Sequence, residues 1–505
     1  MKIYNMAFTG TKINTLYYND LHSSIKYVDT FLEKQDEFYR QNSDEINLTL
    51  CGGDMFLDEN SNNEIVAEKL GPKTDALSVG NHDLEQGEQL ATIIDKYGLQ
   101  GKFLSTNLKY TKTTPLSSIP KSRVIEKQGE RIGIIGVSPF DFNHITFMNT
   151  LTDFIRVKPL DETIKIIKNE VKKLEANGID KIFLLAHTGN QNKSGDTDYY
   201  KELAKIGGID VIIGGHDHNE TDRWETSDRG EPVKIVATGK TPTKYFGENL
   251  DEFGILNLEF DDNGVLIKEK CKNSFEKLTN NGTPQTGETI FTLDRPLKKS
   301  NPLFGHSEIG NIIADSSLWY INTNTNGKPA DIAFVNAGTI RDNFDDPYIT
   351  KADINNALPF TTSTLIKTTL TRKQIIDTLN WCALTTSFGK VAPGIMQVAG
   401  LEYTVNPDLK VTSVHILNSD GSIKVDLDNC DDEERFTVVY DVFLATGVAG
   451  LSEIKKDLEN DTNIEFFEAS RQDALFDYLT TCPKIQNYKQ TRIHKIEVPI
   501  GCGLE

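Results

Sequence analysis

Five short polar clusters in the first half of the chain combine carboxylates, imidazoles, an amide and glycines. The clusters are Asp20-Leu21-His22, Gly52-Gly53-Asp54, Gly80-Asn81-His82-Asp83, His187 and Gly215-His216-Asp217-His218. Oxygen and imidazole nitrogen ligands together suit Mn, Zn, Fe or Co, and this mixture does not select one of them. Because the clusters offer more ligands than one ion needs, they indicate two divalent metal ions that share a carboxylate.

Each cluster taken singly has a structural explanation, such as a capped turn or a buried core histidine. Taken together they are harder to explain that way, because five of the nine histidines lie in them. We assign His22, His187, His216 and His218 as metal ligands. We assign His82 as a catalyst that hydrogen-bonds a transition-state oxygen or protonates a leaving group. The other histidines, which lie outside the clusters and are interpreted as surface or core residues, are His144, His306, His415 and His494.

The segments before these clusters predict the elements that position them. Each cluster follows a mostly apolar, often β-branched run, and these runs are Thr15–Tyr18, Leu48–Cys51, Ala76–Val79, Lys181–Ala186 and Asp210–Ile213. The runs read as strands, so the polar residues lie at strand carboxyl ends, where open α/β sheets build their sites. The sequence therefore predicts one site assembled from successive strand ends.

A helical pattern alternates with the predicted strands. Between Asp161 and Gly178 the apolar residues recur every three or four positions, and Gly178 stands where a helix ends. The strand Lys181–Ala186 follows directly. This alternation, which runs from about Asn14 to Leu258, predicts a layered α/β domain.

Composition changes after this region and predicts a second domain. Residues 273–303 are polar and rich in Asn, Thr, Gly and Pro, which indicates an inter-domain connection. We therefore expect a first domain over 1–272, a linker or hinge over 273–303 and a second α/β domain over 304–505. The helices and strands expected in the second domain are Ile309–Tyr320, Thr371–Cys382, Asp331–Val335, Leu365–Leu370 and Phe436–Val442.

Charge and apolar patterning restrict the partners. A formal net charge of −20 argues against nucleic-acid binding, so a substrate phosphate must be met by metal ions and a few placed arginines. No apolar run approaches membrane-spanning length, and the first residues show no secretory leader. We therefore favour a cytoplasmic protein, with an extracellular or periplasmic location left open for a mature chain. The six cysteines are scattered, which is typical of reduced thiols, and the oligomeric state is not readable.

The order of the motifs resembles a known family. The series D-L-H, G-G-D, G-N-H-D, H and G-H-D-H is similar to that of the calcineurin-like metallophosphoesterases. In the second half, Asn336–Arg341 resembles the N-x-G-x-x-R element of the 5′-nucleotidase C-terminal domain. Leu358–Phe360 and Gln397–Leu401 resemble two further segments of that domain. The resemblance implies an α/β fold: an N-terminal β-sandwich with flanking helices, followed by a C-terminal α/β domain that binds substrate.

The resemblance also implies roles for individual residues. One ion would be held by Asp20, His22, Asp54 and His218, and the other by Asp54, Asn81, His187 and His216. Asp54 would then bridge the two ions. In this family the histidine of the G-N-H element pairs with a carboxylate three residues on. Glu85 stands at that position, where the family usually has Asp, so His82 and Glu85 form the expected catalytic pair.

Substrate contacts are expected in the second domain. Arg341 would meet an anionic group, and Asn336 would shape the same loop or contact a substrate hydroxyl. Ile395 and Leu451 stand where family members carry the two aromatic rings that sandwich a base. Stacking on an aromatic ring typically contributes about 1–3 kcal/mol per base, so these aliphatic residues weaken the expectation of nucleotide preference.

We therefore expect a dimetal phosphoester hydrolase of the 5′-nucleotidase type that acts on a small-molecule substrate. The expected substrates are nucleoside 5′-monophosphates or related nucleotides. Two alternatives stay open. One is hydrolysis of another ester, such as a 2′,3′-cyclic nucleotide, a nucleotide sugar or a sugar phosphate. The other is a non-catalytic binding protein on the same fold, which the complete ligand set disfavours.

Overall fold

The computed structural model divides the 505-residue chain into two compact units, Met1–Thr283 and Pro284–Glu505. The residues that the structure describes are 10–57, 62–142, 155–191, 195–239, 252–278, 289–298, 305–325, 327–360, 363–385, 394–445, 464–485 and 487–495.

The first unit contains two six-stranded sheets. The first sheet, in spatial order, is β14 (Lys272–Lys277), β13 (Glu252–Glu259), β1 (Lys12–Tyr18), β2 (Ile46–Cys51), β3 (Ala76–Ser78) and β4 (Phe103–Leu104). The second is β11 (Thr221–Thr226), β12 (Pro232–Ala237), β10 (Val211–Gly214), β9 (Lys181–Ala186), β7 (Glu130–Val137) and β6 (Ser122–Lys127). A small ladder pairs β5 (Leu108–Tyr110) with β8 (Ile155–Val157).

Parallel pairing brings several strand carboxyl ends to one edge of each sheet. In the first sheet β1, β2, β3 and β4 run parallel. In the second sheet β7, β9, β10 and β12 run parallel. The antiparallel strands β13, β14, β11 and β6 lie on the outer sides of these parallel groups.

The two sheets pack face to face. Ile13 and Tyr17 of β1 point to the core that they share with Phe183 of β9, whereas Leu16 and Tyr18 belong to a different core. This alternation follows from the period of two residues in a strand. The chain therefore forms a β-sandwich whose two outer faces need cover.

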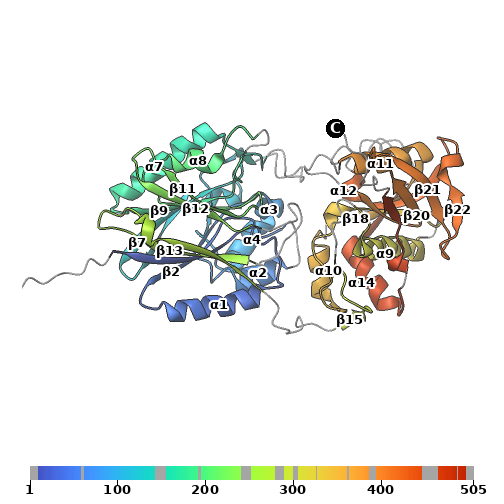
Figure 1. Cartoon of the computed structure of the whole chain (residues 1–505), viewed down its shortest axis with the longest axis horizontal. Helices are drawn as coiled ribbons and strands as arrows, with labels where there is room; N and C mark the ends of the chain where they lie inside the picture. Colours follow the sequence, from blue (N-terminus) through green and yellow to red (C-terminus); the bar gives the residue numbers. More distant parts are fainter. Residues whose placement is uncertain are drawn as a thin grey trace, which may run out of the picture. The chain divides into compact units, whose positions relative to one another are not determined.

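Helices cover both outer faces. The helices are α1 (Val28–Gln41), α2 (Asn63–Lys69), α3 (Asn81–Glu85), α4 (Glu88–Lys96), α7 (Leu160–Ala176) and α8 (Tyr199–Ala204). Helices α1, α2 and α4 share a core with the first sheet, and α7 and α8 share one with the second. Figure 1 shows α1 and α2 along one side of this unit and α7 and α8 along the other. This is the helix-flanked sandwich that the sequence predicted.

Helix α7 and the strand β9 that follows it lie where the sequence predicted them. Helix α7 buries Ile167, Val171 and Leu174, the apolar stripe seen in the sequence. Gly178 then adopts a φ of 74°, a left-handed conformation that favours glycine and ends the helix. Strand β9 begins at Lys181 and ends at Ala186, with the bounds expected from its apolar run.

The second unit has a five-stranded sheet and a four-stranded sheet. The five-stranded sheet is β19 (Met396–Ala399), β16 (Ile332–Asn336), β23 (Arg435–Asp441), β18 (Thr364–Thr371) and β24 (Glu465–Ser470). The four-stranded sheet is β22 (Ile423–Asp426), β21 (Val411–Leu417), β20 (Leu401–Val405) and β25 (Ile493–Lys495). The helices are α9 (Glu308–Asn324), α10 (Lys351–Ala357), α11 (Arg372–Thr385), α12 (Val442–Ala445) and α14 (Arg471–Thr481). One core of this unit contains residues of α9, α10 and α14, and another contains residues of α11 and the four-stranded sheet.

The predicted connection over 273–303 contains more structure than its composition indicated. The strand β14 covers Lys272–Lys277 and pairs with β13, and Tyr17 Oη donates to Asn273 Oδ1 at 2.9 Å. Strand β15 (Thr289–Thr292) pairs with β17 (Tyr348–Thr350) in the second unit. Residues 273–277 are mostly polar because β14 is an edge strand whose side chains are exposed or partly exposed, and they pair within the first unit. Residues 279–288 and 299–303 of the prediction lie outside the described residues.

Two other sequence expectations concern the described part of the chain only. The cysteines there, Cys51, Cys271, Cys382, Cys430 and Cys482, form no disulfides. No helix in the same residues is long and apolar enough to cross a membrane.

Candidate metal centre

The polar residues that follow the parallel strands meet at one edge of the sandwich. Asn19 connects the two sheets there: its Nδ2 donates to Asp20 Oδ2 at 2.6 Å and to the carbonyl of Thr238, which follows β12, at 3.0 Å. In return Asn19 Oδ1 accepts from the backbone N–H of Thr238 at 2.9 Å. The backbone N–H of His216 donates to both carboxylate oxygens of Asp20, at 3.1 and 3.0 Å.

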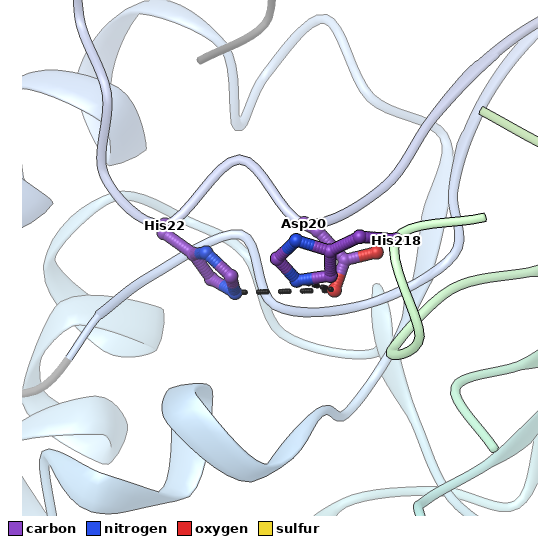
Figure 2. Close-up of side chains that lie close together, drawn as sticks. All are labelled: Asp20, His22 and His218. Atoms are coloured by element: carbon purple, nitrogen blue, oxygen red, sulfur yellow. Dashed lines mark ion pairs between the residues drawn. The ribbon is translucent and has the colours of Figure 1, made fainter. Parts of the chain in front are cut away.

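Three overlapping groups of side chains at this edge have metal-ligand spacing. Within each group the ligand atoms lie within 4.8 Å of one another. The groups are Asp20, His22 and His218; His22, Asp54 and His82; and Asp54, His187 and His216. Figure 2 shows the first group, in which Asp20 Oδ1 lies 3.3 Å from His218 Nε2 and 3.9 Å from His22 Nε2. The first group contains three of the four residues expected around one ion, without Asp54, and the third contains three of the four expected around the other, without Asn81.

Asp54 lies between these groups. Its Oδ2 atom is 3.3 Å from His22 Nε2 and 2.8 Å from His187 Nε2. Its Oδ1 atom accepts the backbone N–H of His82 at 2.9 Å. One carboxylate oxygen therefore faces ligands of both predicted ions, which is the position that a bridging ligand requires.

Two buried atoms fit a bound cation. Asn81 Oδ1 and His187 Nε2 make no hydrogen bond within the described part of the chain. His187 Nδ1 lies 2.9 Å from the carbonyl oxygen of Gly52, so it carries the hydrogen and leaves a lone pair on Nε2. That lone pair faces a carboxylate oxygen 2.8 Å away, and two acceptors that close need a proton or a metal ion between them. The donor set therefore fits divalent ions.

Backbone strain concentrates on the same residues. The predicted ligands with a left-handed φ are Asp20 (54°), His22 (49°), Asp54 (52°), His216 (87°) and His218 (52°). Non-glycine residues held in this region cost of the order of 1–3 kcal/mol each and cluster at functional sites. The fold holds these side chains in place against that strain.

Two glycines are required by close approach. Gly53 has a φ of 111°, and a Cβ there would lie 2.5 Å from His187 Nδ1. A Cβ on Gly80 would overlap the Asp54 carboxylate. The glycines in these two motifs therefore make room for the side chains of predicted ligands.

Charge and burial act against each other at these ligands. Burial opposes ionisation of Asp20, but the imidazoles of His218 and His187 outweigh it and hold the pKa of Asp20 below its usual range. Burial alone would lower the pKa of His187, but the carboxylates of Asp54 and Asp20 raise that pKa to about 9. The two carboxylates thus favour a bound proton or cation beside them.

Asp83 organises the loops beneath the ligands. Its Oδ2 atom accepts the backbone N–H groups of Asp54 at 3.1 Å and Gly80 at 2.9 Å, and its Oδ1 atom accepts that of Phe56 at 2.9 Å. Burial and the neighbouring Asp54 raise the pKa of Asp83 to about 7. Asp83 therefore ties the loop after β2 to the turn after β3.

We expect Asp83→Ala to lower the free energy of unfolding of the first unit by about 3 kcal/mol or more, because three buried N–H groups lose their acceptor. The measurement is urea unfolding of metal-free protein, followed by hydrogen–deuterium exchange of peptides from the first unit. The matched control is Asp29→Ala, which removes an exposed ion pair with Lys69 and should cost less than about 1 kcal/mol. Equal midpoints for the two variants would show that Asp83 does not hold these loops.

His82 and Glu85 lie on the short helix α3 with their side chains in contact. His82 Nδ1 is 2.6 Å from Glu85 Oε2, and the spacing of three residues places both on one face of the helix. The Glu85 side chain is 7% exposed, whereas the His82 side chain is 23% exposed. Since a carboxylate accepts and Nδ1 donates, Glu85 orients the His82 ring through Nδ1.

The predicted substrate contacts of the second unit have mixed outcomes. Arg341 carries its guanidinium over the Phe360 ring, with its central carbon 5.0 Å from the ring centroid. Asn336 is buried and its Oδ1 accepts from Arg471 Nη1 at 3.0 Å, and Arg471 also pairs with the buried Asp441 at 2.7 Å. The side-chain oxygen of Asn336 is thus held in a buried network, and the role of Asn336 toward a substrate stays a prediction.

Of the two expected base-facing positions, Ile395 lies within the described residues. Ile395 is 1% exposed and belongs to the hydrophobic core of the second unit, so its side chain packs inside the fold rather than lining an open surface. Leu451 lies outside the described residues.

Three polar residues at the first unit's site were not singled out from the sequence: Asn19, Asp83 and Asp141. Asn19 and Asp83 are adjacent to assigned residues, and their roles depend on side-chain geometry that spacing does not show. Asp141 follows the apolar run that forms β7, so the strand-end rule itself pointed to it.

Comparison with known proteins agrees with this geometry. The family of calcineurin-like phosphoesterases matches residues 13–220, and the 5′-nucleotidase C-terminal domain matches residues 286–456. A 5′-nucleotidase precursor from Thermus thermophilus has the same fold, with a TM-score of 0.68, 21% identity, and coverage of 97% of this chain and 100% of that one. The fold and site thus define a metallophosphoesterase joined to a second α/β domain. The chain thus carries a calcineurin-like phosphoesterase domain followed by a 5′-nucleotidase C-terminal domain.

Individual relatives are distant. The trifunctional nucleotide phosphoesterase protein YfkN of Bacillus subtilis (strain 168) is 27% identical over 434 residues, which is 75% of this chain and 28% of that protein. The 5′-nucleotidase of Mus musculus is 25% identical and covers 76% of this chain and 70% of its own length. An apyrase of Tabanus yao is 27% identical, and the match covers 76% of this chain and 73% of the apyrase. The match thus spans little more than a quarter of the Bacillus protein.

Proposed function

We propose that this chain hydrolyses phosphate esters of nucleotides, with nucleoside 5′-monophosphates as the first class to test. The observation that carries the proposal is the shared position of Asp54, one oxygen of which faces both groups of histidines. A site with that arrangement is built for two divalent ions and for chemistry on an anionic ester. The names of the relatives, which include nucleotidases and apyrases, support a nucleotide substrate.

The ligands would divide around Asp54. Asp20, His22 and His218 would hold one ion, and Asn81, His187 and His216 the other, with Asp54 shared. When bound, such ions polarise phosphoryl oxygens and lower the pKa of a water molecule. Mn, Zn, Fe and Co all suit this donor set.

His82 would act on the leaving group. Glu85 orients its ring through Nδ1, which leaves Nε2 to hydrogen-bond a phosphoryl oxygen or to donate a proton to the departing alkoxide. The side chain is exposed enough to reach a ligand, whereas Glu85 is buried behind it.

The second unit would supply substrate selection. Arg341 offers a planar guanidinium that is held against Phe360 and suits phosphate or carboxylate oxygens. Ile395 is aliphatic and buried, so it offers no aromatic ring at the first expected stacking position. We therefore propose that the base contributes less to binding than the phosphate does.

The test is phosphate release from protein that has been stripped of metal and reloaded with Mn²⁺. AMP, a nucleotide sugar, a 2′,3′-cyclic nucleotide and an aryl phosphate are compared in parallel, with Asp54→Asn as the inactive control. Fast AMP hydrolysis that the control loses supports the proposal. Hydrolysis of the cyclic nucleotide or nucleotide sugar in preference to AMP would keep the dimetal chemistry and overturn the monophosphate assignment. Two bound ions without any turnover would favour a binding protein.

A further inference from the structure

The histidines around Asp54 share one structural feature. In His187, His82 and His216, one ring nitrogen lies close to a protein oxygen. His187 Nδ1 is 2.9 Å from the carbonyl oxygen of Gly52, and His82 Nδ1 is 2.6 Å from Glu85 Oε2. In the third, His216 Nε2 lies 3.2 Å from Asp141 Oδ1. Each oxygen fixes which nitrogen carries the hydrogen and leaves the other for an ion or a substrate.

Asp141 reaches His216 from a different strand. It lies shortly after the end of β7, which runs parallel to β9, so it arises at the same edge of the second sheet as His187. The preceding residue, Phe140, packs its ring on Tyr199 at a centroid distance of 4.8 Å, and Tyr199 begins helix α8. This aromatic contact anchors the loop, so the carboxylate is presented from a packed support.

His216 needs such a partner because its backbone alone does not set its ring. Its backbone is held in a left-handed conformation, with a φ of 87°, and its N–H donates to Asp20. These contacts fix the Cα position but leave rotation of the imidazole open. The ring must also choose between two tautomers, and only one of them leaves a lone pair on Nδ1.

We propose that Asp141 is a positioning residue that accepts the Nε2 hydrogen of His216 and thereby presents the Nδ1 lone pair to the ion shared with Asp54 and His187. This inference rests on the proposed dimetal function. Asp141 acts through His216 and not as a ligand, because the groups with metal-ligand spacing among the described residues include His216 but not Asp141. A carboxylate behind a metal-bound imidazole also makes that nitrogen ligand more basic.

The test measures metal binding directly. Metal-free Asp141→Ala, Asp141→Asn and wild-type protein are titrated with Mn²⁺ by calorimetry and by electron paramagnetic resonance. In Asp141→Ala we expect one of the two Mn²⁺ affinities to fall by about 10–100-fold while the other is unchanged, with loss of the spin-coupled signal at substoichiometric Mn²⁺. The amide oxygen of Asp141→Asn still accepts a hydrogen bond. The Mn²⁺ affinity of this variant at the affected site should therefore lie between those of wild type and Asp141→Ala. The matched control Asp161→Ala removes an exposed carboxylate on α7 and should bind like the wild type.

The outcomes separate this inference from the proposed function. Equal affinities in wild type and Asp141→Ala overturn the inference, as does an equal loss at both sites, which would indicate a general structural role. Asp141→Asn guards against a variant that does not fold, because it keeps the side-chain size. Two ions bound without phosphate release would overturn the proposed function and leave the binding result intact. Turnover of Asp141→Ala that recovers at saturating Mn²⁺ supports a positioning role, and a loss that persists at saturation contradicts it.

Discussion

Asp54→Asn is expected to lower kcat/KM for the best substrate by at least about a thousandfold. Asn keeps the size of the side chain and one acceptor for the His82 backbone N–H, but it removes the negative charge that faces both His22 and His187. Stabilisation of transition-state charge by bound ions is worth several kcal/mol, and each 1.36 kcal/mol corresponds to about tenfold in rate. Loss of the shared ligand disturbs both ions, so the effect should exceed that of any ligand specific to one ion.

Metal content provides the discriminating measurement. Asp54→Asn should retain less than one tightly bound ion per chain after dialysis, as measured by inductively coupled plasma mass spectrometry. Asp20→Asn, the matched comparison, removes a carboxylate from one group only and should retain about one ion. If Asp54→Asn kept two ions and most of its turnover, Asp54 would not be a bridging ligand.

The elements of the first unit were predictable because buried strand and helix faces carry apolar residues at regular positions. The run Lys181–Ala186 is buried along its whole length and is apolar after Lys181, as expected for a central parallel strand with covered faces. The stripe of α7 follows from a helix with one buried face. Since parallel strands align their carboxyl ends, placing the strands also placed most of the ligands.

Residues whose roles depend on contacts between segments distant in sequence were harder to predict. Asp141 and His216 are distant in sequence and meet because β7, β9 and β10 are neighbours in the sheet. Strand order does not follow from strand composition, so no spacing rule pairs these two side chains. Asp83 stood inside a recognised motif, but its three backbone partners depend on two loops that fold together.

The second unit shows the limit of carrying positions over from a family. Asn336 matches its motif, and the structure uses it to receive a hydrogen bond from the buried Arg471. Ile395 is aliphatic where a ring was expected, and it packs into the core, as an aliphatic side chain does when no ligand surface needs it. The edge strand β14 was read as linker because exposed edge strands and linkers share a polar composition.

The second large effect is expected from His82→Ala, which should lower kcat for AMP by about a hundredfold to ten-thousandfold, the range typical of a positioned general acid or base. Metal content should stay unchanged, because the predicted ligand sets are complete without His82. The cause would be loss of a proton donor to a departing alkoxide, which is a poor leaving group. An aryl phosphate, whose phenolate leaves more easily without a proton, should therefore lose much less turnover in the same variant.

Glu85 provides the internal check on this role. Glu85→Gln keeps a hydrogen-bond acceptor for His82 Nδ1 but removes the charge that stabilises the protonated ring, so its effect on AMP hydrolysis should lie between wild type and His82→Ala. Equal losses for AMP and the aryl phosphate would mean that His82 contacts a phosphoryl oxygen rather than the leaving group. A variant that lost an ion would identify His82 as a ligand instead, since it lies within 4.8 Å of ligand atoms of His22 and Asp54. The leaving-group comparison and the metal analysis together therefore assign the residue one of three distinct roles.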